Sequence, residues 1–386
     1  MKVLHIIPDL APATGGPVTS VLGLARAQTA LGHEVSIAST DWGMSRRPSL
    51  EGVHFHLFPC RYDSWRWAPA LGKFLRREIG NYDVATVESL WQYPTYIAGR
   101  ACREAGTPYV VSTNGMLDEW SLAQKSWKKR PYLRFVERAT LEGAAAVHLT
   151  SRGESEHSHL ESFRIRKLII PLGVHSSSYR ELPDRASFVR RYPELEGKRI
   201  ILFLGRLHFK KQPDVAIKAF HKAHAGNGDA RLVLAGGGDP DYVKSLRRLV
   251  EDLGMRRSVL FTGLLQGDAV KEAYRAATVF ILPSWQENFG LSVVEAMAAG
   301  CPVLVSNHID LASEIEGAGA GLSVAPSVED NAAALDYLLN DGVLRARLGE
   351  AGRKLVLEKF TWEQCARSFM AAFEDILSGR GISPVR

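Results

Sequence analysis

Residues 279–306, VFILPSWQENFGLSVVEAMAAGCPVLVS, decide the fold class. Short apolar runs at both ends are typical of buried strands, and between them turn-forming residues precede a helix-forming run that stops at Gly300. This strand–loop–helix–strand order predicts a parallel α/β sheet, which binds ligands at the carboxyl edge of its strands. The helix start near Gly290 presents unpaired N–H groups and a positive dipole end, which favour an anion such as a diphosphate.

Two carboxylates flank this predicted anion site, Glu287 in the loop and Glu295 inside the helix. An ionised carboxylate only accepts hydrogen bonds, so beside a phosphate it suits the hydroxyl groups of a sugar or a ribose. Composition alone is equally consistent with two solvated charges.

The same alternation of strands and helices extends along most of the chain. It pauses after 171–174, and the polar segment that follows, with two prolines, reads as a linker with a short helix. The predicted division is a domain at 1–175, a linker at 176–197 and a second domain at 198–361. We expect strands at 2–7, 35–39, 53–58, 83–87, 109–113 and 146–150, and then at 199–206, 231–235, 259–262, 279–282 and 302–305.

Composition indicates a soluble globular protein. The 386 residues are 46% hydrophobic and 23% charged, with a formal net charge of +6, and no apolar run approaches the length of a membrane span. The first residues form too short an apolar run for a signal peptide. Four scattered cysteines without a CxxC pair suggest neither a zinc site nor disulfides. A cytoplasmic location is the simplest expectation.

Two further stretches carry residues suited to phosphate binding. Arg206 and Lys211, in LGRLHFKKQPD at 204–214, follow a predicted strand and could neutralise a diphosphate leaving group. Gly15 and Gly16, after the first strand, let the backbone approach a ligand closely. The alternatives are a solvated basic loop and a turn that needs glycine for its geometry alone.

Asp239 and Asp241 imitate a metal-binding DxD pair. Their position directly after three glycines fits a simple loop, and we expect no metal site.

The run from Pro283 to Val303, with seven residues between Glu287 and Glu295, resembles the E-x7-E region of retaining GT-B glycosyltransferases of family 4, the glycosyl transferases group 1. The resemblance implies an α/β fold of two doubly wound Rossmann-like domains facing each other across a cleft. It also implies that Glu287 contacts the transferred sugar and Glu295 the nucleotide ribose. The neighbouring residues Asn288, Phe289, Gly290 and Leu291 are expected in the nucleotide-sugar site.

Other matches to the family are shorter. Residues 204–214 resemble its G-R-L-x-x-x-K motif, which selects Lys211 rather than Lys210. The segment 13–21 resembles the glycine loop under the donor phosphate, and 263–270, with Leu265, resembles the stretch whose backbone lies against the nucleotide base. The resemblance also implies that the last segment, 362–386, crosses back to the first domain.

Asn114 departs from the family pattern. Most relatives carry a histidine at the corresponding place, near the transferred sugar. Asparagine can hydrogen-bond a sugar hydroxyl but carries neither a proton nor a charge, so a mechanism that needs an imidazole here is in doubt.

The expected function is therefore that of a metal-independent, retaining glycosyltransferase. It would move a hexose from a nucleoside-diphosphate sugar to a glycan or lipid-linked glycan acceptor in cell-surface polysaccharide synthesis, with no cofactor beyond that substrate. Same-face attack is favoured because the sequence offers no second carboxylate as a nucleophile. The alternatives are a sugar-nucleotide epimerase or hydrolase on the same fold, or a nucleotide-binding protein without catalysis. A nucleic-acid partner is not expected, since no basic–aromatic RNA motif is present.

Basic and aromatic residues concentrate at 120–141. Beyond Pro131, which we expect to break or start a helix, apolar residues recur at helical spacing and arginines recur every four residues on another face. This composition suits peripheral contact with an anionic membrane, on the inner face where a lipid-linked acceptor would lie. A helix with its apolar face in the core and its arginines in water is the alternative. The apolar positions at helical spacing are Tyr132, Phe135, Val136 and Ala139. The arginines on the other face are Arg130, Arg134 and Arg138, and the basic and aromatic residues that precede them are Trp120, Lys125, Trp127, Lys128 and Lys129.

Overall fold

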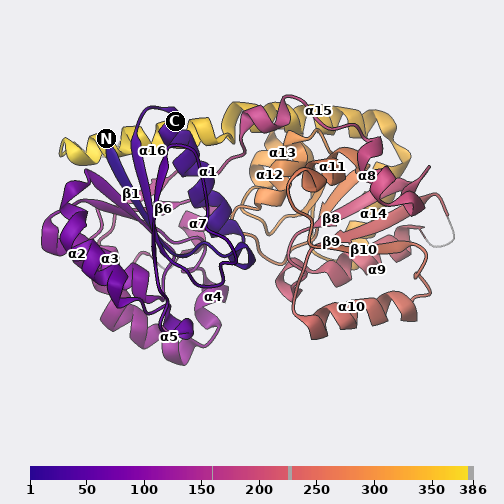
Figure 1. Cartoon of the computed structure of the whole chain (residues 1–386). Helices are drawn as coiled ribbons and strands as arrows, with labels where there is room; N and C mark the ends of the chain where they lie inside the picture. Colours follow the sequence, from indigo (N-terminus) through magenta and orange to yellow (C-terminus); the bar gives the residue numbers. More distant parts are fainter. Residues whose placement is uncertain (159, 225–227, 381–386) are drawn as a thin grey trace. The chain divides into compact units, whose positions relative to one another are not determined.

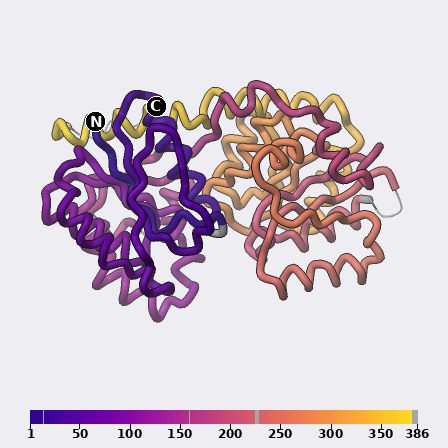
Figure 2. The backbone as a smooth tube through the Cα atoms, viewed as in Figure 1, coloured from indigo at the N-terminus to yellow at the C-terminus, as the bar shows by residue number. Residues whose placement is uncertain are grey.

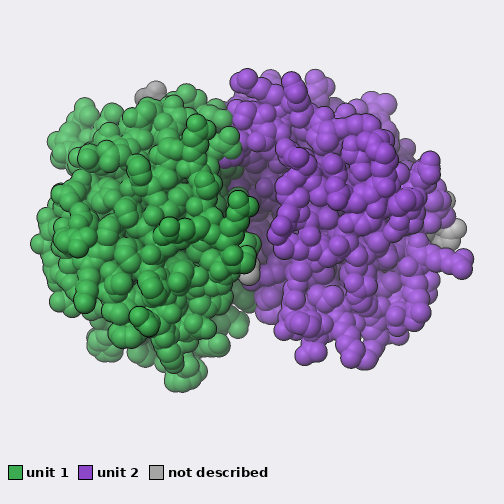
Figure 3. All heavy atoms as spheres, in the orientation of Figure 1, with its two compact units in different colours: residues 1–173, 362–386 green, residues 174–361 purple. Residues whose placement is uncertain are grey.

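The computed structural model describes residues 1–158, 160–224 and 228–380, and it divides into two compact units. Unit 1 joins Met1–Gly173 to the segment that begins at Trp362, and unit 2 is Val174–Thr361 (Figure 3). Residues 381–386, the end of the C-terminal segment expected to return to the first domain, lie outside the described residues.

Unit 1 is built on a seven-stranded parallel sheet with the order β3-β2-β1-β4-β5-β6-β7. Figure 1 labels two of its strands, β1 and β6. The chain leaves β1 in one direction for β2 and β3 and then returns to its other side for β4, so the order reverses between β1 and β4. The strands are mostly buried, which explains their continuous apolar runs. They are β1 Lys2–Asp9, β2 Glu34–Thr40, β3 Val53–Phe58, β4 Val84–Glu88, β5 Tyr109–Ser112, β6 Ala146–Leu149 and β7 Lys167–Ile169.

Helices complete unit 1, and the last of them packs against the first. A Cβ atom at Gly23 of α1 would lie 2.3 Å from the Trp362 indole, so only glycine permits this close packing with α16. Figure 2 shows the yellow α16 returning beside the indigo start of the chain. The helices are α1 Gly16–Ala30, α2 Pro69–Glu78, α3 Tyr93–Ala105, α4 Glu119–Ala123, α5 Ser126–Tyr132, the π-helix η4 Leu133–Glu137, α6 Arg138–Glu142, α7 Arg152–His157 and α16 Trp362–Leu377.

Unit 2 has a six-stranded parallel sheet with the order β10-β9-β8-β11-β12-β13, which reverses between β8 and β11. Its strands are β8 Arg199–Leu204, β9 Ala230–Ala235, β10 Val259–Gly263, β11 Val279–Leu282, β12 Val303–Ser306 and β13 Gly321–Val324. Its helices are α8 Ala186–Arg191, α9 Pro213–His224, α10 Pro240–Asp252, α11 Asp268–Ala276, α12 Leu291–Ala298, α13 Ala312–Gly317, α14 Val328–Asn340 and α15 Gly342–Lys359. Both sheets therefore have the doubly wound, Rossmann-like topology that the sequence predicts.

Three details differ from the expectations. Every predicted strand occurs, but the edge strands β7 and β13 were not expected. Each is short and has only one fully buried residue, so neither shows the continuous apolar run of the central strands. The segment 176–197, expected as a linker, is part of unit 2. Its composition is polar, yet Tyr179, Phe188 and Leu195 are spaced through it and are buried.

The third difference concerns the segment after Pro131. Pro131 lies inside α5 and neither starts nor ends it, and the π-helix η4 follows. A π-helix has a wider turn than an α-helix, so it changes which side chains face inward. Glu137 and Thr140 are fully buried, whereas Phe135 is 77% exposed. The apolar face predicted from α-helical spacing is therefore not the buried face.

Candidate functional site

The loops after β8 and β11 bring two of the predicted catalytic residues of unit 2 together, Lys211 and Glu287. These strands are neighbours at the point where the strand order reverses, the usual ligand position in open α/β sheets. The Lys211 Nζ forms an ion pair with Glu287 Oε2, and each side chain is 19% exposed. The two loops are also joined by the Trp285 N–H, which donates to the Lys210 carbonyl at 2.9 Å.

The loop after β8 is electropositive. Arg206 is exposed to solvent beyond the end of β8. The pKa of the neighbouring His208 is lowered from its usual 6.5, first by burial and then by the charges of Arg206, Lys210 and Lys211. A diphosphate at this edge would therefore meet a positive potential.

Helix α12 starts at the same edge with the geometry expected of an anion site. Gly290 caps it with a φ of 74°, a left-handed conformation that favours glycine. The Gly290 carbonyl accepts the N–H groups of Val293 and Val294, at 2.8 and 3.3 Å, so an anion here would be held by the preceding N–H groups, those of Leu291 and Ser292. Ser292 is a residue that the sequence reasoning missed. Its hydroxyl is buried without a hydrogen-bond partner among the described residues, as expected of a group that awaits a ligand.

Glu295 lies on α12 with only part of its surface exposed. The Tyr274 hydroxyl donates a hydrogen bond to its Oε2 at 3.0 Å. Burial raises the pKa of Glu295 to about 7, and the bond from Tyr274 opposes that rise. Hydroxyl groups of a ribose would add hydrogen-bond donors and so favour the ionised form.

The remaining predicted residues of unit 2 have different surroundings. Phe289 is buried and packs edge-on against Phe360, with ring centroids 5.7 Å apart, so its side chain anchors the loop. Asn288 and Leu291 are partly exposed on either side of the Phe289–Gly290 pair. Leu265 follows β10, which two strands separate from β11, so it lies further along the same edge.

Unit 1 places its predicted residues at the carboxyl edge of its own sheet. Gly15 and Gly16 follow β1, and a Cβ atom at either glycine would meet no atom within 4 Å. Gly15 has a φ of 75°, so its backbone requires glycine. Asn114 follows β5 with a φ of 50°, and its amide donates to the Ser112 carbonyl at 3.4 Å. These backbones are open to solvent or to a ligand.

Glu154 is a second residue that the sequence reasoning missed. Its buried carboxylate accepts hydrogen bonds from the Thr113 hydroxyl at 2.9 Å and the Gly115 N–H at 2.8 Å. It also accepts from the Thr150 N–H and hydroxyl, at 2.7 and 2.8 Å. Glu154 therefore holds the turn on both sides of Asn114.

A sequence signal for Glu154 exists. Ser151 and Glu154 have the S-x-x-E spacing of a capping box, and the Ser151 hydroxyl accepts the Glu154 N–H at 2.9 Å. That signal predicts the start of α7. It does not predict that the carboxylate reaches the loop after β5.

Glu88, at the end of β4, lies beside Asn114. The Ser112 hydroxyl donates to its carboxyl group at 3.4 Å, and the Asn114 amide is a further partner. Burial raises the pKa of Glu88 to about 7. A carboxyl group whose pKa burial raises toward neutrality therefore lies next to Asn114.

Two other features are not part of the candidate site. The Asp239 carboxylate caps α10, accepting the N–H groups of Asp241 and Tyr242 at 3.0 and 3.1 Å, which fits the loop interpretation. Across the described ranges, no group of three or more His, Cys, Asp or Glu side chains is placed to hold a metal ion.

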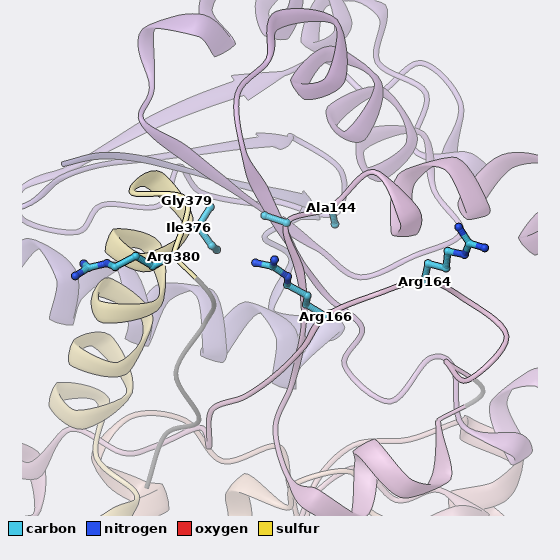
Figure 4. Close-up of a pocket in the computed structure, with 7 residues that line it drawn as sticks. Ala144, Arg164, Arg166, Ile376, Gly379 and Arg380 are labelled. Carbon is cyan, nitrogen blue, oxygen red and sulfur yellow. The ribbon is translucent and has the colours of Figure 1, made fainter.

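A hollow of about 380 Å³ lies in unit 1, on the segments before β6 and β7, and includes none of the predicted residues. Figure 4 shows Arg166 directed toward it and Arg164 and Arg380 directed away. It is lined by Ala144, Ala145, Arg164, Arg166, Ile376, Gly379 and Arg380.

Both halves of the chain match known protein families. Residues 184–355 match the family described as glycosyl transferases group 1, and residues 15–173 match a glycosyl transferase 4-like domain. A D-inositol 3-phosphate glycosyltransferase from Acidothermus cellulolyticus is 32% identical over 322 residues, 79% of this chain and 69% of that protein. A GDP-mannose-dependent alpha-(1-6)-phosphatidylinositol monomannoside mannosyltransferase from Mycolicibacterium smegmatis is 25% identical, with 98% of each chain covered.

Solved structures agree on the fold. HepE from Anabaena, in complex with UDP and glucose, superposes with a TM-score of 0.80 at 17% identity, and the match covers 97% of this chain and all of that one. At this identity the likeness shows the fold, which is GT-B. With both halves of the sequence matched, this chain is a glycosyltransferase that takes its sugar from a nucleotide sugar, and it belongs to the glycosyl transferases group 1 family.

Proposed function

We propose that unit 2 is the nucleotide-sugar domain, that unit 1 is the acceptor-side domain, and that the acceptor is a glycan or lipid-linked glycan of cell-surface polysaccharide synthesis. The observation that carries the donor assignment is the Lys211–Glu287 ion pair where the unit 2 sheet reverses its order. The pairing of a cation, which suits phosphate, with a carboxylate, which suits sugar hydroxyls, supports this proposal.

The roles of the residues in unit 2 follow from their charges. Arg206, Lys211 and the start of α12 hold the diphosphate and stabilise the negative charge that grows on it as the sugar leaves. Glu287 accepts hydrogen bonds from the hydroxyls of the transferred sugar, and Glu295 accepts them from the ribose.

The reaction retains the anomeric configuration by attack on the same face. The bond between the anomeric carbon and the diphosphate oxygen breaks, and a bond from the acceptor oxygen to that carbon forms. The leaving phosphate oxygen takes the acceptor proton. Pairing with the Lys211 ammonium lowers the nucleophilicity of Glu287, which argues against a covalent glycosyl-enzyme intermediate.

In unit 1, the hydrogen bonds from Thr113 and Gly115 to the Glu154 carboxylate fix the turn that carries Asn114. The Asn114 amide is therefore preorganised to hydrogen-bond a sugar hydroxyl. In this loop the Gly16 N–H is the donor for an anionic or hydroxylated group, because the Gly15 N–H already donates to the Pro12 carbonyl at 3.2 Å.

The test is product analysis with a panel of nucleotide sugars, each with and without glycan and lipid-linked acceptors. We expect nucleoside diphosphate release to depend on an acceptor and to yield a glycoside of retained configuration. Equal release without acceptor supports a hydrolase, an isomerised sugar nucleotide supports an epimerase, and binding without turnover supports a non-catalytic nucleotide-binding protein.

We further propose that unit 1 makes peripheral contact with an anionic membrane, on the cytoplasmic face. Within the described ranges, every helix is too short or too polar to span a bilayer. Trp127 is 74% exposed and Phe135 is 77% exposed. The Lys128 ammonium lies 4.8 Å from the Trp127 ring centroid and the Arg134 guanidinium 5.9 Å from that of Phe135.

We call this the basic–aromatic surface, and we define it by Trp127, Phe135, Lys125, Lys128, Arg130 and Arg134. Exposed aromatic side chains with adjacent cations suit the headgroup layer, where each basic residue contributes about 1 kcal/mol. The mannosyltransferase from Mycolicibacterium smegmatis has a phosphatidylinositol derivative in its name, which supports a lipid acceptor.

The test is co-sedimentation with vesicles of phosphatidylcholine and phosphatidylglycerol, at low and at physiological salt. Replacing the four cations of the basic–aromatic surface by Gln should release the protein without changing nucleotide binding. The matched control replaces four exposed cations of unit 2 by Gln, namely Lys244, Arg248, Arg256 and Arg257. If the parent protein never sediments, or if both variants are released equally, the membrane proposal fails and a soluble acceptor is favoured.

A further inference from the structure

Trp285 combines an exposed ring with a backbone that is held on two sides. The side chain is 52% exposed, although it lies in a loop beside a well-packed sheet. Its N–H donates to the Lys210 carbonyl at 2.9 Å, and its own carbonyl accepts a hydrogen bond from His308 Nδ1 at 3.3 Å. The His308 ring packs edge-on against the indole, with centroids 5.1 Å apart and planes at 75°. The indole is therefore exposed but restrained.

This position adjoins the carboxylate that we assign to the transferred sugar. Trp285 precedes Glu287 by two residues, and the Glu287 carbonyl accepts the Asp310 N–H at 3.3 Å. The loops after β8, β11 and β12 are thus tied together around Trp285 and Glu287. A ligand bound to Glu287 would find this indole within the same loop cluster.

An exposed tryptophan normally costs free energy because its apolar surface contacts water. Here 52% of the residue stays exposed, and the His308 ring supports the indole from the side. A restrained aromatic ring offers a large contact area at low cost in conformational entropy. These are the properties of a binding platform.

We propose that Trp285 is a platform on which a hexopyranose ring stacks beside Glu287. The face of an aromatic ring carries partial negative charge, which meets the C–H groups on the apolar face of a pyranose. The hydroxyls at the ring edge stay free for Glu287. The same chemistry is offered by the sugar of the donor and by the terminal sugar of a glycan acceptor. The proposal rests on the glycosyltransferase function above and adds a specificity-determining residue to it.

The experiment compares the parent protein with Trp285→Ala and Trp285→Phe. Calorimetric titration measures affinity for UDP-glucose, GDP-mannose, UDP and GDP, and steady-state kinetics measures the acceptor KM with whichever donor is used. Tyr337→Ala is the matched control, since Tyr337 is a similarly exposed aromatic residue on α14 of the same unit. Unchanged melting temperatures of the variants exclude a folding defect.

If the donor sugar stacks on Trp285, Trp285→Ala lowers the affinity for the nucleotide sugar by about 5- to 10-fold and leaves the affinity for the free nucleoside diphosphate unchanged. If the acceptor sugar stacks there, both nucleotide affinities stay the same and the acceptor KM rises by a similar factor. In either case Trp285→Phe keeps most of the affinity that Trp285→Ala loses, and Tyr337→Ala has the same affinities and acceptor KM as the parent.

The platform is refuted if Trp285→Ala has the same nucleotide affinities and acceptor KM as the parent. It is also refuted if the substitution lowers the affinities for the nucleotide sugar and for the free nucleoside diphosphate equally. In those cases the parent still binds and transfers, so the proposed function survives. A parent protein that binds neither nucleotide sugar nor diphosphate contradicts the function itself, and the platform falls with it.

Discussion

Replacing Lys211 by Ala tests the donor site in a way that distinguishes it from a general loss of positive charge. Lys210 and Lys211 are adjacent in the turn Phe209–Lys211. Lys211 forms the ion pair with Glu287, and this pair holds a cation at the edge of the sheet. Lys210→Ala removes the same charge from the same turn. The pair of variants therefore isolates the position of the cation.

The expected magnitude follows from the partial burial of the pair. With 19% of each side chain exposed, the local effective dielectric constant is nearer about 20 than the value for water, so one charge at about 4 Å from a phosphate oxygen is worth up to about 4 kcal/mol before desolvation. Losing one preorganised donor from a transition state costs about 100-fold in turnover, or roughly 2.7 kcal/mol. Lys211→Ala also leaves the Glu287 carboxylate without its cation, beside the diphosphate.

The assay measures kcat and KM for nucleoside diphosphate release with the best donor. We expect Lys211→Ala to lower kcat by on the order of 100-fold and Lys210→Ala to change it by less than about 5-fold. The double variant Lys211→Ala with Glu287→Gln should recover part of the lost nucleotide affinity, because it removes the unpaired carboxylate charge. A larger loss at Lys210 than at Lys211 would refute the register of the motif and the role of the ion pair.

The remaining predictions concern buried carboxyl groups and metal dependence. Burial raises the pKa values of Glu88 and Glu137 from 4.5 to about 7. Between about pH 4.5 and pH 7 the folded state therefore binds more protons than the unfolded state. The free energy of unfolding should fall as the pH rises through this range. Glu137→Gln, followed by urea denaturation at pH 5 and pH 7, should flatten this dependence, and an unchanged slope would contradict it. Glu154→Gln should lower kcat by about 10-fold or more with little effect on nucleotide affinity, whereas equal losses in both would indicate general unfolding. Transfer should persist in EDTA, and loss that Mg²⁺ restores would return Asp239 to consideration.

Regular elements with strong patterns were predictable from the sequence. The helix α12 between β11 and β12 follows from apolar strands, a glycine-capped start and a glycine stop, since local composition alone specifies each boundary. The edge strands β7 and β13 were missed because each has only one fully buried residue, so neither carries the continuous apolar run that marks the buried four-residue strands β11 and β12.

The candidate residues of unit 2 were chosen from motifs in two separate stretches, Lys211 from 204–214 and Glu287 with Glu295 from 283–303. The contact between Lys211 and Glu287 depends on the fold, because 76 positions separate them in the chain. Glu154 and Tyr274 could not be found this way, because each acts on a residue far along the chain, at Thr113 and at Glu295. The π-helix after Pro131 also escaped prediction, since one wider turn shifts the buried face without a distinct sequence signal.

The central claim is that Glu295 binds the ribose of a nucleotide sugar in its ionised form. The most direct measurement is calorimetric titration of UDP-glucose and GDP-mannose into the parent protein and Glu295→Gln at pH 6 and pH 8. Because burial sets the pKa of Glu295 at about 7, the parent should bind about 10-fold more tightly at pH 8 than at pH 6. Glu295→Gln should bind weakly at both values, losing on the order of 10-fold or more relative to the parent at pH 8. Equal affinity of the two proteins at pH 8, with no pH dependence in the parent, would contradict the account.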